Sequence, residues 1–414
     1  MDASLPALAR GKELVSPRRR LRLAVVTETF PPEVNGVAMT IGRLLPAMEQ
    51  RGHRVSLVRP RQGEADCAAD SARPTILVPG VPLPRYPNLR MGLPASRALA
   101  RAWREQRPDL VHVVTEGPLG WSAVAVARRL GLPVTSAFHT NFHAYSAHYG
   151  LGWLSGAIAG YLRLFHNRTA LTLVPTDTLR RELAAQGFHH LEVLSRGVDT
   201  QLFHPQRRDA SLRAHWGAGP DTPVVLYVGR LAPEKNLLQL LGGFSALRAR
   251  RGDARLVLVG DGPMRAQLER LRPDAIFAGT RRGEDLAVHY ASADVFLFPS
   301  LTETFGNVTL EAMASGLAVL AYDYAAAHEL ITHGEDGLLA PFAANEDFCA
   351  EAAKLADLNW ARTLGRAARR RALAMDWSCV HDRFETILMR VLLEQERRSH
   401  ANALSSRARA PERL

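Results

Sequence analysis

Cysteine is scarce in this sequence. Only Cys67, Cys349 and Cys379 occur among 414 residues, far apart and without a Cys-x-x-Cys pair. This spacing argues against a disulfide framework or a zinc site and is typical of a reducing cytoplasm. The sequence also has no run of ~18 consecutive apolar residues, so we expect no transmembrane helix. The charged N-terminus lacks the apolar core of a signal peptide, which again favours a cytoplasmic protein.

Acidic residues are too few to balance the basic ones, and the formal net charge is +11. Much of the excess lies at the two ends of the chain. Because neither end shows apolar periodicity, we predict disordered basic tails at 1–20 and 397–414. Two interpretations stay open for the tails: attraction to anionic lipid head groups on the inner face of the cell membrane, or solubility alone. Nucleic acid is not an expected partner, because no basic stripe is interleaved with aromatic residues.

Short apolar runs rich in valine and leucine recur along the chain, each followed by a helical pattern. Such runs predict strands covered on both faces, and their alternation with helices predicts parallel sheets in a doubly wound α/β fold. The expected strands form two sets. They are 21–29, 53–60, 109–117, 133–140 and 171–176, then 223–230, 255–262, 274–280, 294–300 and 318–323.

The two sets of strands predict two Rossmann-like domains that face a cleft. A polar segment that contains prolines and glycines, 201–222, separates them and is predicted to be the linker. The N-terminal domain then spans 21–200 and the C-terminal domain 223–375. An amphipathic helix over 376–396 is expected to cross back to the N-terminal domain. Doubly wound folds bind ligands at the carboxyl ends of strands, where the motifs of this chain fall.

Two candidate residues of the N-terminal domain follow expected strands. Gly36 opens a helix after the first strand, and the N–H groups at such a helix start can bind a phosphate. His139 ends another strand, where it can donate to a sugar hydroxyl or steady a developing charge. An ordinary turn and a structural histidine are the alternatives. The loop before Gly36 is not the Gly-x-Gly-x-x-Gly fingerprint of NAD-binding proteins.

In the second set, the first strand is followed by Arg230 and Lys235. Two cations that converge at a strand end suit a diphosphate, and they can stabilise a departing nucleotide diphosphate without a metal ion. Solvated surface charge is the alternative. A further strand–helix turn with two glycines, 259–263, suits either close approach to a ligand or plain turn chemistry.

The segment 299–316 is the most informative, because a strand runs there into a loop and then a helix. A carboxylate in the loop, Glu303, can hold sugar hydroxyls, and one inside the helix, Glu311, can bind both ribose hydroxyls. Gly306 and Asn307 expose N–H groups at the helix start. Ordinary capping by a threonine is the alternative. Glu311, however, lies among apolar residues and needs a partner there.

Together these residues resemble a known family. The run from Glu303 to Glu311 matches the E-x7-E motif of retaining GT-B glycosyltransferases, in the form typical of glycosyltransferase family 4. The other motifs, and the stretch 196–205, fall in the order of that family, and the likeness spans about 21–395. It is closest to bacterial GDP-mannose-dependent α-mannosyltransferases and to sulfolipid-synthase-like enzymes. The resemblance implies a GT-B fold and hexosyl transfer.

The resemblance also implies roles for particular residues. The catalytic group would be His139, Glu303, Arg230 and Lys235, and the donor-binding group Gly36, Phe305, Gly306, Asn307 and Glu311. A hexose, with mannose favoured, would pass from a GDP- or UDP-linked sugar to a lipid or glycan acceptor, with retained configuration and without a metal or cofactor. Apolar residues and arginines in 83–93 and 150–165 fit an acceptor or membrane surface, and the latter equally fits a core helix.

Other functions remain possible from the sequence alone. A GT-B sugar-nucleotide epimerase is one, although the E-x7-E motif speaks against it, and a phosphorylase of this fold would need a pyridoxal-phosphate lysine in a much longer chain. A membrane-surface or other binding protein with a degenerate glycosyltransferase fold is another. The intact set of candidate site residues favours an enzyme.

Overall fold

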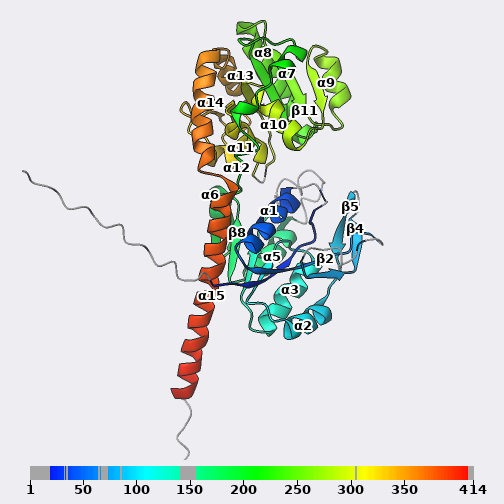
Figure 1. The fold of residues 1–414 in the computed structure, drawn as a ribbon, viewed down its shortest axis with the longest axis vertical. Helices are drawn as coiled ribbons and strands as arrows, with labels where there is room; N and C mark the ends of the chain where they lie inside the picture. The colour runs from blue at the N-terminus through cyan, green and yellow to red at the C-terminus, as the bar shows by residue number, and fades with distance from the viewer. Residues whose placement is uncertain are drawn as a thin grey trace, which may run out of the picture.

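A computed structural model gives the structure of residues 19–31, 33, 36–63, 66, 73–83, 86–139, 155–303 and 305–408. Two α/β domains are stacked end to end, and one long helix runs beside the N-terminal domain (Figure 1). Helices α6 (Asp177–Ala185) and α12 (Ala325–Leu330) meet at the domain boundary, where Thr178 N donates to Glu329 Oε1 at 3.1 Å. The doubly wound α/β architecture is the one that the sequence predicted.

The N-terminal domain is built on a parallel seven-stranded sheet with the order β3-β2-β1-β6-β7-β8-β9. Its strands are β1 (Arg22–Val26), β2 (Arg54–Pro60), β3 (Thr75–Val78), β6 (Leu110–Val113), β7 (Val134–Ala137), β8 (Leu171–Val174) and β9 (Leu191–Val193). The described helices are α1 (Gly36–Gln50), α2 (Ser96–Glu105), α3 (Pro118–Arg129), α5 (Ser155–His166) and α6, and β4 (Gly80–Leu83) pairs with β5 (Tyr86–Gly92) as an antiparallel hairpin.

The C-terminal domain has a parallel six-stranded sheet with the order β12-β11-β10-β13-β14-β15. Its strands are β10 (Val224–Val228), β11 (Arg255–Val259), β12 (Ile276–Gly279), β13 (Val295–Phe298), β14 (Ala318–Tyr322) and β15 (Leu338–Ala340). Its helices include α7 (Ala210–His215), α8 (Leu237–Arg250), α9 (Arg265–Leu271), α10 (Gly283–Ala291), α11 (Asn307–Ala314), α12, α13 (Asn345–Lys354) and α14 (Leu358–Leu373).

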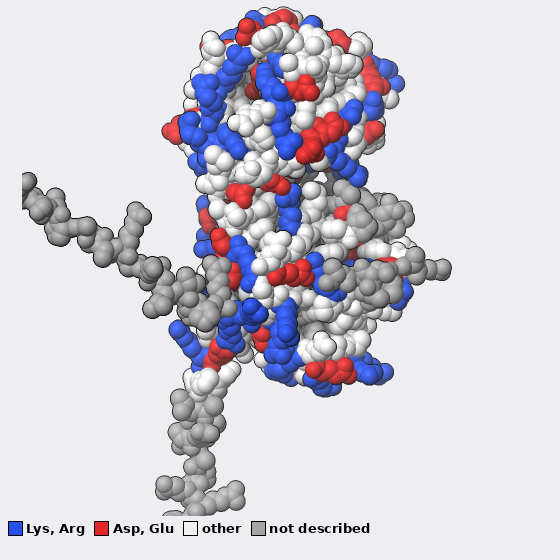
Figure 2. All heavy atoms as spheres, viewed as in Figure 1, with Lys and Arg blue, Asp and Glu red and all other residues white. Residues whose placement is uncertain are grey.

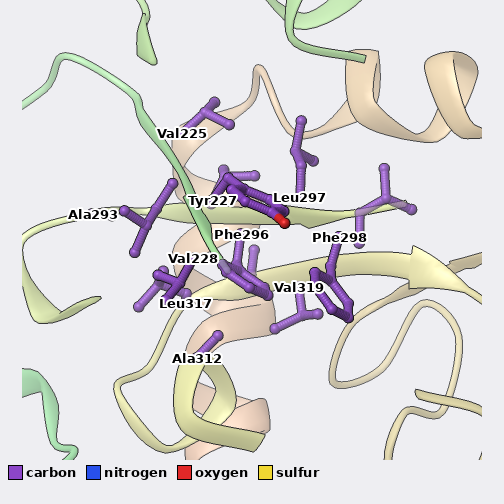
Figure 3. Packing of buried hydrophobic residues seen from close by; sticks show 14 of the residues in the cluster. Val225, Tyr227, Val228, Ala293, Phe296, Leu297, Phe298, Ala312, Leu317 and Val319 are labelled. Carbon is purple, nitrogen blue, oxygen red and sulfur yellow. The ribbon is translucent and has the colours of Figure 1, made fainter. Parts of the chain in front are cut away.

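Three aromatic side chains lie among aliphatic ones at the centre of this second sheet (Figure 3). Tyr227 of β10 and Phe298 of β13 stack with ring centroids 6.3 Å apart, and Phe296 lies 5.7 Å from Phe298. Tyr227 is fully buried, yet its hydroxyl donates to Arg230 O at 3.1 Å. The core therefore fixes the backbone of the loop that follows β10.

The segment 201–222, predicted to be a linker, is instead part of the C-terminal domain. Arg213 in α7 is 3% exposed and pairs with Asp294 at 3.0 Å, and Trp216 packs into the domain core. The prolines and glycines of this segment mark surface turns, but its buried arginine and tryptophan attach it to the sheet. The interdomain connection lies just before it.

The chain crosses between the domains twice, and the crossings lie side by side. Val198 N donates to Met375 O at 3.0 Å, and Trp377 N donates to Val198 O at 3.2 Å. Thr200 Oγ1 donates to Asp376 Oδ2 at 2.7 Å. A short parallel bridge thus joins the outgoing and returning segments.

The returning segment continues as α15 (Trp377–Ala408), which runs along the N-terminal domain (Figure 1). Phe384, Ile387 and Leu388 are at most 2% exposed and share a core with the β1 and α1 side chains. Residues 397–408, predicted as part of a disordered tail, are helical, because arginine and alanine are good helix formers. The rest of both predicted tails, 1–18 and 409–414, lies outside the described residues.

None of the helices in the described part of the chain combines the length and the apolar character that a membrane span needs. On the face shown in Figure 2, basic and acidic side chains are interspersed over both domains.

Candidate active site between the two domains

Apart from His139, which follows β7, the predicted site residues lie after strands at the points where strand order reverses. In the N-terminal sheet β1 lies between β2 and β6, and the loop after β1 leads to Gly36. In the C-terminal sheet β10 lies between β11 and β13, and the loops after β10 and β13 carry Lys235 and Glu303. Doubly wound sheets bind ligands at such switch points.

Lys235 and Glu303 form an ion pair across two neighbouring loops, through Nζ and Oε1. Ser300 Oγ donates to the same Glu303 oxygen at 2.9 Å, and Lys235 Nζ lies 5.9 Å from the centre of the Phe298 ring. The side chains of Lys235 and Glu303 are 17% and 16% exposed. Their mutual pairing makes a mostly buried cation and anion tolerable next to each other.

Arg230 does not converge with Lys235 in this structure. Its guanidinium pairs with Glu234, and its side chain is 60% exposed. A diphosphate that approaches this loop therefore meets two cations that each already hold a glutamate. Arg230 would have to leave Glu234 to join Lys235 on one ligand.

The glycine turn 259–263 is explained by packing. A Cβ on Gly260 would lie 1.9 Å from Gly229 O, and a Cβ on Gly262 would lie 2.4 Å from Leu231 O. Backbone hydrogen bonds join the turn to the loop after β10. Of the two interpretations that the sequence left open, the structure favours turn chemistry, in which the turn supports the loop that carries the cations.

Helix α11 starts directly after the Glu303 loop. Gly306 precedes it with φ +94°, a left-handed conformation that favours glycine, and no side chain caps the helix. Phe305 is 2% exposed and packs into the core. Asn307 Oδ1 is buried and has no hydrogen-bond partner among the described residues. Capping by Thr302 is therefore not observed, and Thr304 lies outside the described residues.

Glu311 has the partner that its apolar surroundings require, because Tyr290 Oη donates to it at 3.0 Å. Burial raises the pKa of Glu311 to about 7, against the smaller lowering effects of Tyr290 and Arg43. Arg43 belongs to α1 of the other domain and pairs with Asp199 at 3.1 Å. Arg43 thus brings a positive charge of the N-terminal domain near Glu311.

The N-terminal half of the site contains Gly36, His139 and Arg196. Gly36 is the first residue of α1, and a Cβ there would lie 2.7 Å from Nη1 of Arg196. His139 follows β7, and both of its ring nitrogens are buried without a hydrogen-bond partner in the described structure. Burial, and next the charge of Arg196, hold the pKa of His139 well below its usual value. The imidazole is therefore neutral and can donate a hydrogen bond.

Two family models cover most of the chain: "Glycosyltransferase Family 4" matches 34–202, and "Glycosyl transferases group 1" matches 222–357. A GDP-mannose-dependent alpha-mannosyltransferase of Mycobacterium tuberculosis is 37% identical over 87% of this chain and 94% of its own length. The chain belongs to the family 4 glycosyltransferases. The same organism has a 30% identical GDP-mannose-dependent alpha-(1-6)-phosphatidylinositol monomannoside mannosyltransferase, matched over 77% of this chain and 84% of its own.

Solved structures agree with the fold. A glycosyltransferase of Rickettsia africae, 16% identical, superposes with a TM-score of 0.71 over 90% of this chain and 99% of its own. The protein is thus an enzyme, a glycosyltransferase with the GT-B fold that the sequence predicted.

Sequence reasoning missed two parts of this glycosyltransferase. Arg196 entered only as part of a family-like stretch, without a role. Glu28 and Glu116 were not singled out, although each follows a buried strand just as Glu303 does. Burial, and then the charge of Glu116, raise the pKa of Glu28 to about 7. Glu116 Oε1 lies 3.4 Å from Nε2 of the fully buried His166.

The candidate acceptor segments of the glycosyltransferase are partly described. In α5, Leu162 and Phe165 are buried, as a core helix requires, while Tyr161 and Leu164 are 42% and 51% exposed. Residues 150–154 and most side chains of 83–93 lie outside the described residues.

Proposed function

We propose that this glycosyltransferase moves a mannosyl residue from GDP-mannose to a lipid acceptor with retention of anomeric configuration. The names of both M. tuberculosis relatives support GDP-mannose as donor, and the phosphatidylinositol mannoside enzyme supports a lipid acceptor. A glycan acceptor and a UDP-linked donor are the competing possibilities within the same reaction class.

The observation that carries the proposal is the Lys235–Glu303 pair at the switch point of the donor-side sheet. A donor diphosphate bound by Lys235 would release Glu303 for the hydroxyls of the transferred sugar. Glu311, one helix further on, would accept hydrogen bonds from the ribose. Gly36 would offer its N–H at the positive end of α1 to the phosphates from the opposite domain.

Departure of the diphosphate is the step that needs positive charge. As the bond between C1 and the phosphate oxygen breaks, its electron pair stays on the diphosphate. We propose that Lys235 and Arg230 stabilise this charge, so that no metal ion or cofactor is required.

Retention would follow from attack on the face that the diphosphate leaves. The acceptor hydroxyl oxygen would bond to C1 while its proton passes to a phosphate oxygen of the departing group. Neutral His139 would donate to a sugar hydroxyl rather than remove a proton.

A lipid acceptor would place the enzyme on the cytoplasmic face of a membrane. The exposed Tyr161 and Leu164 on α5, with Arg163 and Arg168 nearby in sequence, are the proposed contact. The basic ends of the chain would add attraction to anionic lipids.

The test is transfer of labelled sugar from GDP-mannose, UDP-glucose and UDP-galactose to extracted lipids, with thermal shifts against GDP, UDP and ADP alongside. A ligand that binds only the folded state raises apparent stability by roughly 2.7 kcal/mol at a hundredfold excess over Kd. Of the three nucleotides, we expect only GDP to shift the melting temperature. Of the three sugar donors, we expect only GDP-mannose to label lipid. A melting shift with UDP only would contradict the donor assignment. Labelled polysaccharide without labelled lipid would contradict the acceptor assignment.

The metal-free step has its own test. Chelation by EDTA is expected to leave the transfer rate unchanged. A loss of activity that magnesium or manganese restores would show that the cations of the chain are insufficient.

A further inference from the structure

Arg196 is a buried cation with almost no partner. The residue is 8% exposed, and its Nε is buried without a hydrogen-bond partner in the part of the chain that the structure describes. Among the described residues, its Nη1 reaches only Gly36 O, at 3.5 Å, which is long for a hydrogen bond. No salt bridge links it to a carboxylate among the described residues. Burial of an unpaired charge is costly, so this side chain points to an anionic ligand.

The two N-terminal-domain groups beside the guanidinium, Gly36 and His139, strengthen this argument, because neither is negatively charged. Arg196 lies against Gly36, at the positive end of the α1 dipole. His139 beside it is neutral, since burial and Arg196 lower its pKa. Burial lowers the pKa of Arg196 itself to about 10, and the acidic group that opposes this shift is Glu303 of the other domain. Arg196 therefore faces the donor half of the site.

Arg213 shows by contrast how a structural arginine is satisfied in this protein. It is 3% exposed, and its Nη1 donates to Asp294 Oδ2 at 3.0 Å and to Ser292 O at 2.7 Å. Its Nη2 donates to Gly219 O at 2.6 Å. Arg196, buried nearly as deeply, has none of these contacts, so architecture alone does not explain it.

We propose that Arg196 is a third cation of the donor site, supplied by the N-terminal domain, and that it binds the diphosphate of the nucleotide sugar opposite Lys235. The proposal rests on the proposed function, which puts a nucleoside diphosphate between Gly36 and Lys235. A planar guanidinium matches two phosphate oxygens at once. Because charge accumulates on the diphosphate as it departs, Arg196 would speed transfer as well as binding.

An anionic group on the acceptor could supply the same chemistry. The diphosphate is favoured because two predicted donor groups are near Arg196: the Gly36 helix start is in contact with it, and the charge of Glu303 acts on it. Measurements on the donor without acceptor separate the two sources.

The experiment is calorimetric titration of the full-length protein with GDP and with GMP, without acceptor. The variants are Arg196→Gln, Arg196→Lys and the matched control Arg101→Gln, whose arginine lies on the exposed surface of α2 and pairs with Glu105. Thermal melting of each protein without nucleotide is recorded in parallel.

For Arg196→Gln we expect GDP affinity to fall about tenfold to a hundredfold and GMP affinity by less than about threefold, because GMP lacks the second phosphate. The GDP affinity of Arg196→Lys should lie between those of the wild type and Arg196→Gln, and the GDP affinity of Arg101→Gln should match the wild type. Melting of Arg196→Gln without nucleotide should occur at an equal or higher temperature, since a buried unpaired charge is removed. If Arg196 were a structural arginine, Arg196→Gln would melt at a lower temperature than the wild type.

Unchanged GDP affinity in Arg196→Gln and Arg196→Lys would overturn the proposal, even if the KM for the acceptor rose. An equal loss of GDP and GMP affinity would overturn it too, because the effect would not reside in the diphosphate. If Arg196→Gln does not fold, Arg196→Lys decides alone. If the wild type binds no nucleoside diphosphate at all, the proposed function fails first, and the two failures remain distinguishable.

Discussion

Lys235 holds Oε1 of Glu303 where the carboxyl ends of β10 and β13 lie side by side. Each residue is thus held by the group that it would have to release for a substrate: Lys235 for a phosphate and Glu303 for a sugar. Donor binding would exchange one internal ion pair for two contacts with the ligand. After such an exchange the lysine is paired with a phosphate and the carboxylate accepts hydrogen bonds from hydroxyls, which limits the desolvation cost of a mostly buried site.

Replacement of Glu303 tests the sugar contact. Glu303→Ala is expected to slow transfer by at least about a hundredfold to a thousandfold, the range seen when one preorganised electrostatic group is removed. The melting temperature should fall as well, because Lys235 is left mostly buried without its carboxylate partner. Initial rates and thermal melting give both quantities. Glu335→Ala, on an exposed turn, is the control, and near-normal turnover of Glu303→Ala would remove Glu303 from the mechanism.

The two donor-side cations should contribute unequally. Lys235 is 17% exposed and Arg230 is 60% exposed, so a phosphate contact with Lys235 is less screened by water. Lys235→Ala should weaken GDP binding about tenfold or more, Arg230→Ala only a few-fold, and the double variant most. Titration calorimetry measures this, and the control is Lys354→Ala, whose side chain on α13 is half exposed. GDP affinity that is the same in all variants would show that the phosphate site lies elsewhere.

The raised pKa of Glu311 predicts a pH dependence of nucleotide binding. Ribose hydroxyls donate to an ionised carboxylate, and with a pKa of about 7 only a tenth of Glu311 is ionised at pH 6. GDP affinity should therefore fall up to about tenfold between pH 8 and pH 6, measured by calorimetry. Glu311→Gln should bind more weakly at pH 8 and lose most of this dependence. An unchanged pH profile in Glu311→Gln would contradict the ribose assignment.

Glu28 predicts a pH dependence of stability instead. Its pKa in the folded protein, about 7, exceeds the ordinary value of 4.5, so the folded state binds the proton more tightly. Its contribution to stability is then present below about pH 4.5 and is lost as the pH rises toward 7. Glu28→Gln should raise the melting temperature at pH 8 and leave it nearly unchanged at pH 4.5. Equal shifts at both values would mean that ionisation of Glu28 carries no cost.

Much of the fold could be predicted because buried parallel strands read as continuous apolar runs. All ten predicted strands are present. The missed parallel strands β3, β9 and β15 are edge strands of three or four residues, and edge positions such as those of β9 are only partly buried, so their sequence is mixed. The segment 201–222 was mistaken for a linker because a buried arginine like Arg213 cannot be told from a solvated one in the sequence.

The site was predictable in its parts but not in its contacts. Spacing within 299–316 located Glu303, and its place after an expected strand located Lys235. The two residues are 68 positions apart, however, and only the order of strands in the sheet brings them together. Arg230 illustrates the limit in the other direction, since proximity to Lys235 in sequence did not make them converge. Arg196 stands out because it is buried and lacks a carboxylate partner among the described residues, and a sequence shows neither property.

The bridge between the two crossings predicts an effect far from the chemistry. A Cβ on Gly197 would lie 2.9 Å from Trp377 Cα and 3.0 Å from Trp377 N, so Gly197→Ala must push the crossing segments apart. We expect a loss of about 1–3 kcal/mol of stability, as for other overpacked sites. The rate of transfer should fall as well, because Arg196 adjoins Gly197 and domain closure depends on this connection. Denaturant unfolding and initial rates measure the two effects. Gly252→Ala is the matched control, since none of the described atoms lies within 4 Å of a Cβ there. If Gly197→Ala were as stable and active as Gly252→Ala, close contact between the crossings would not be required.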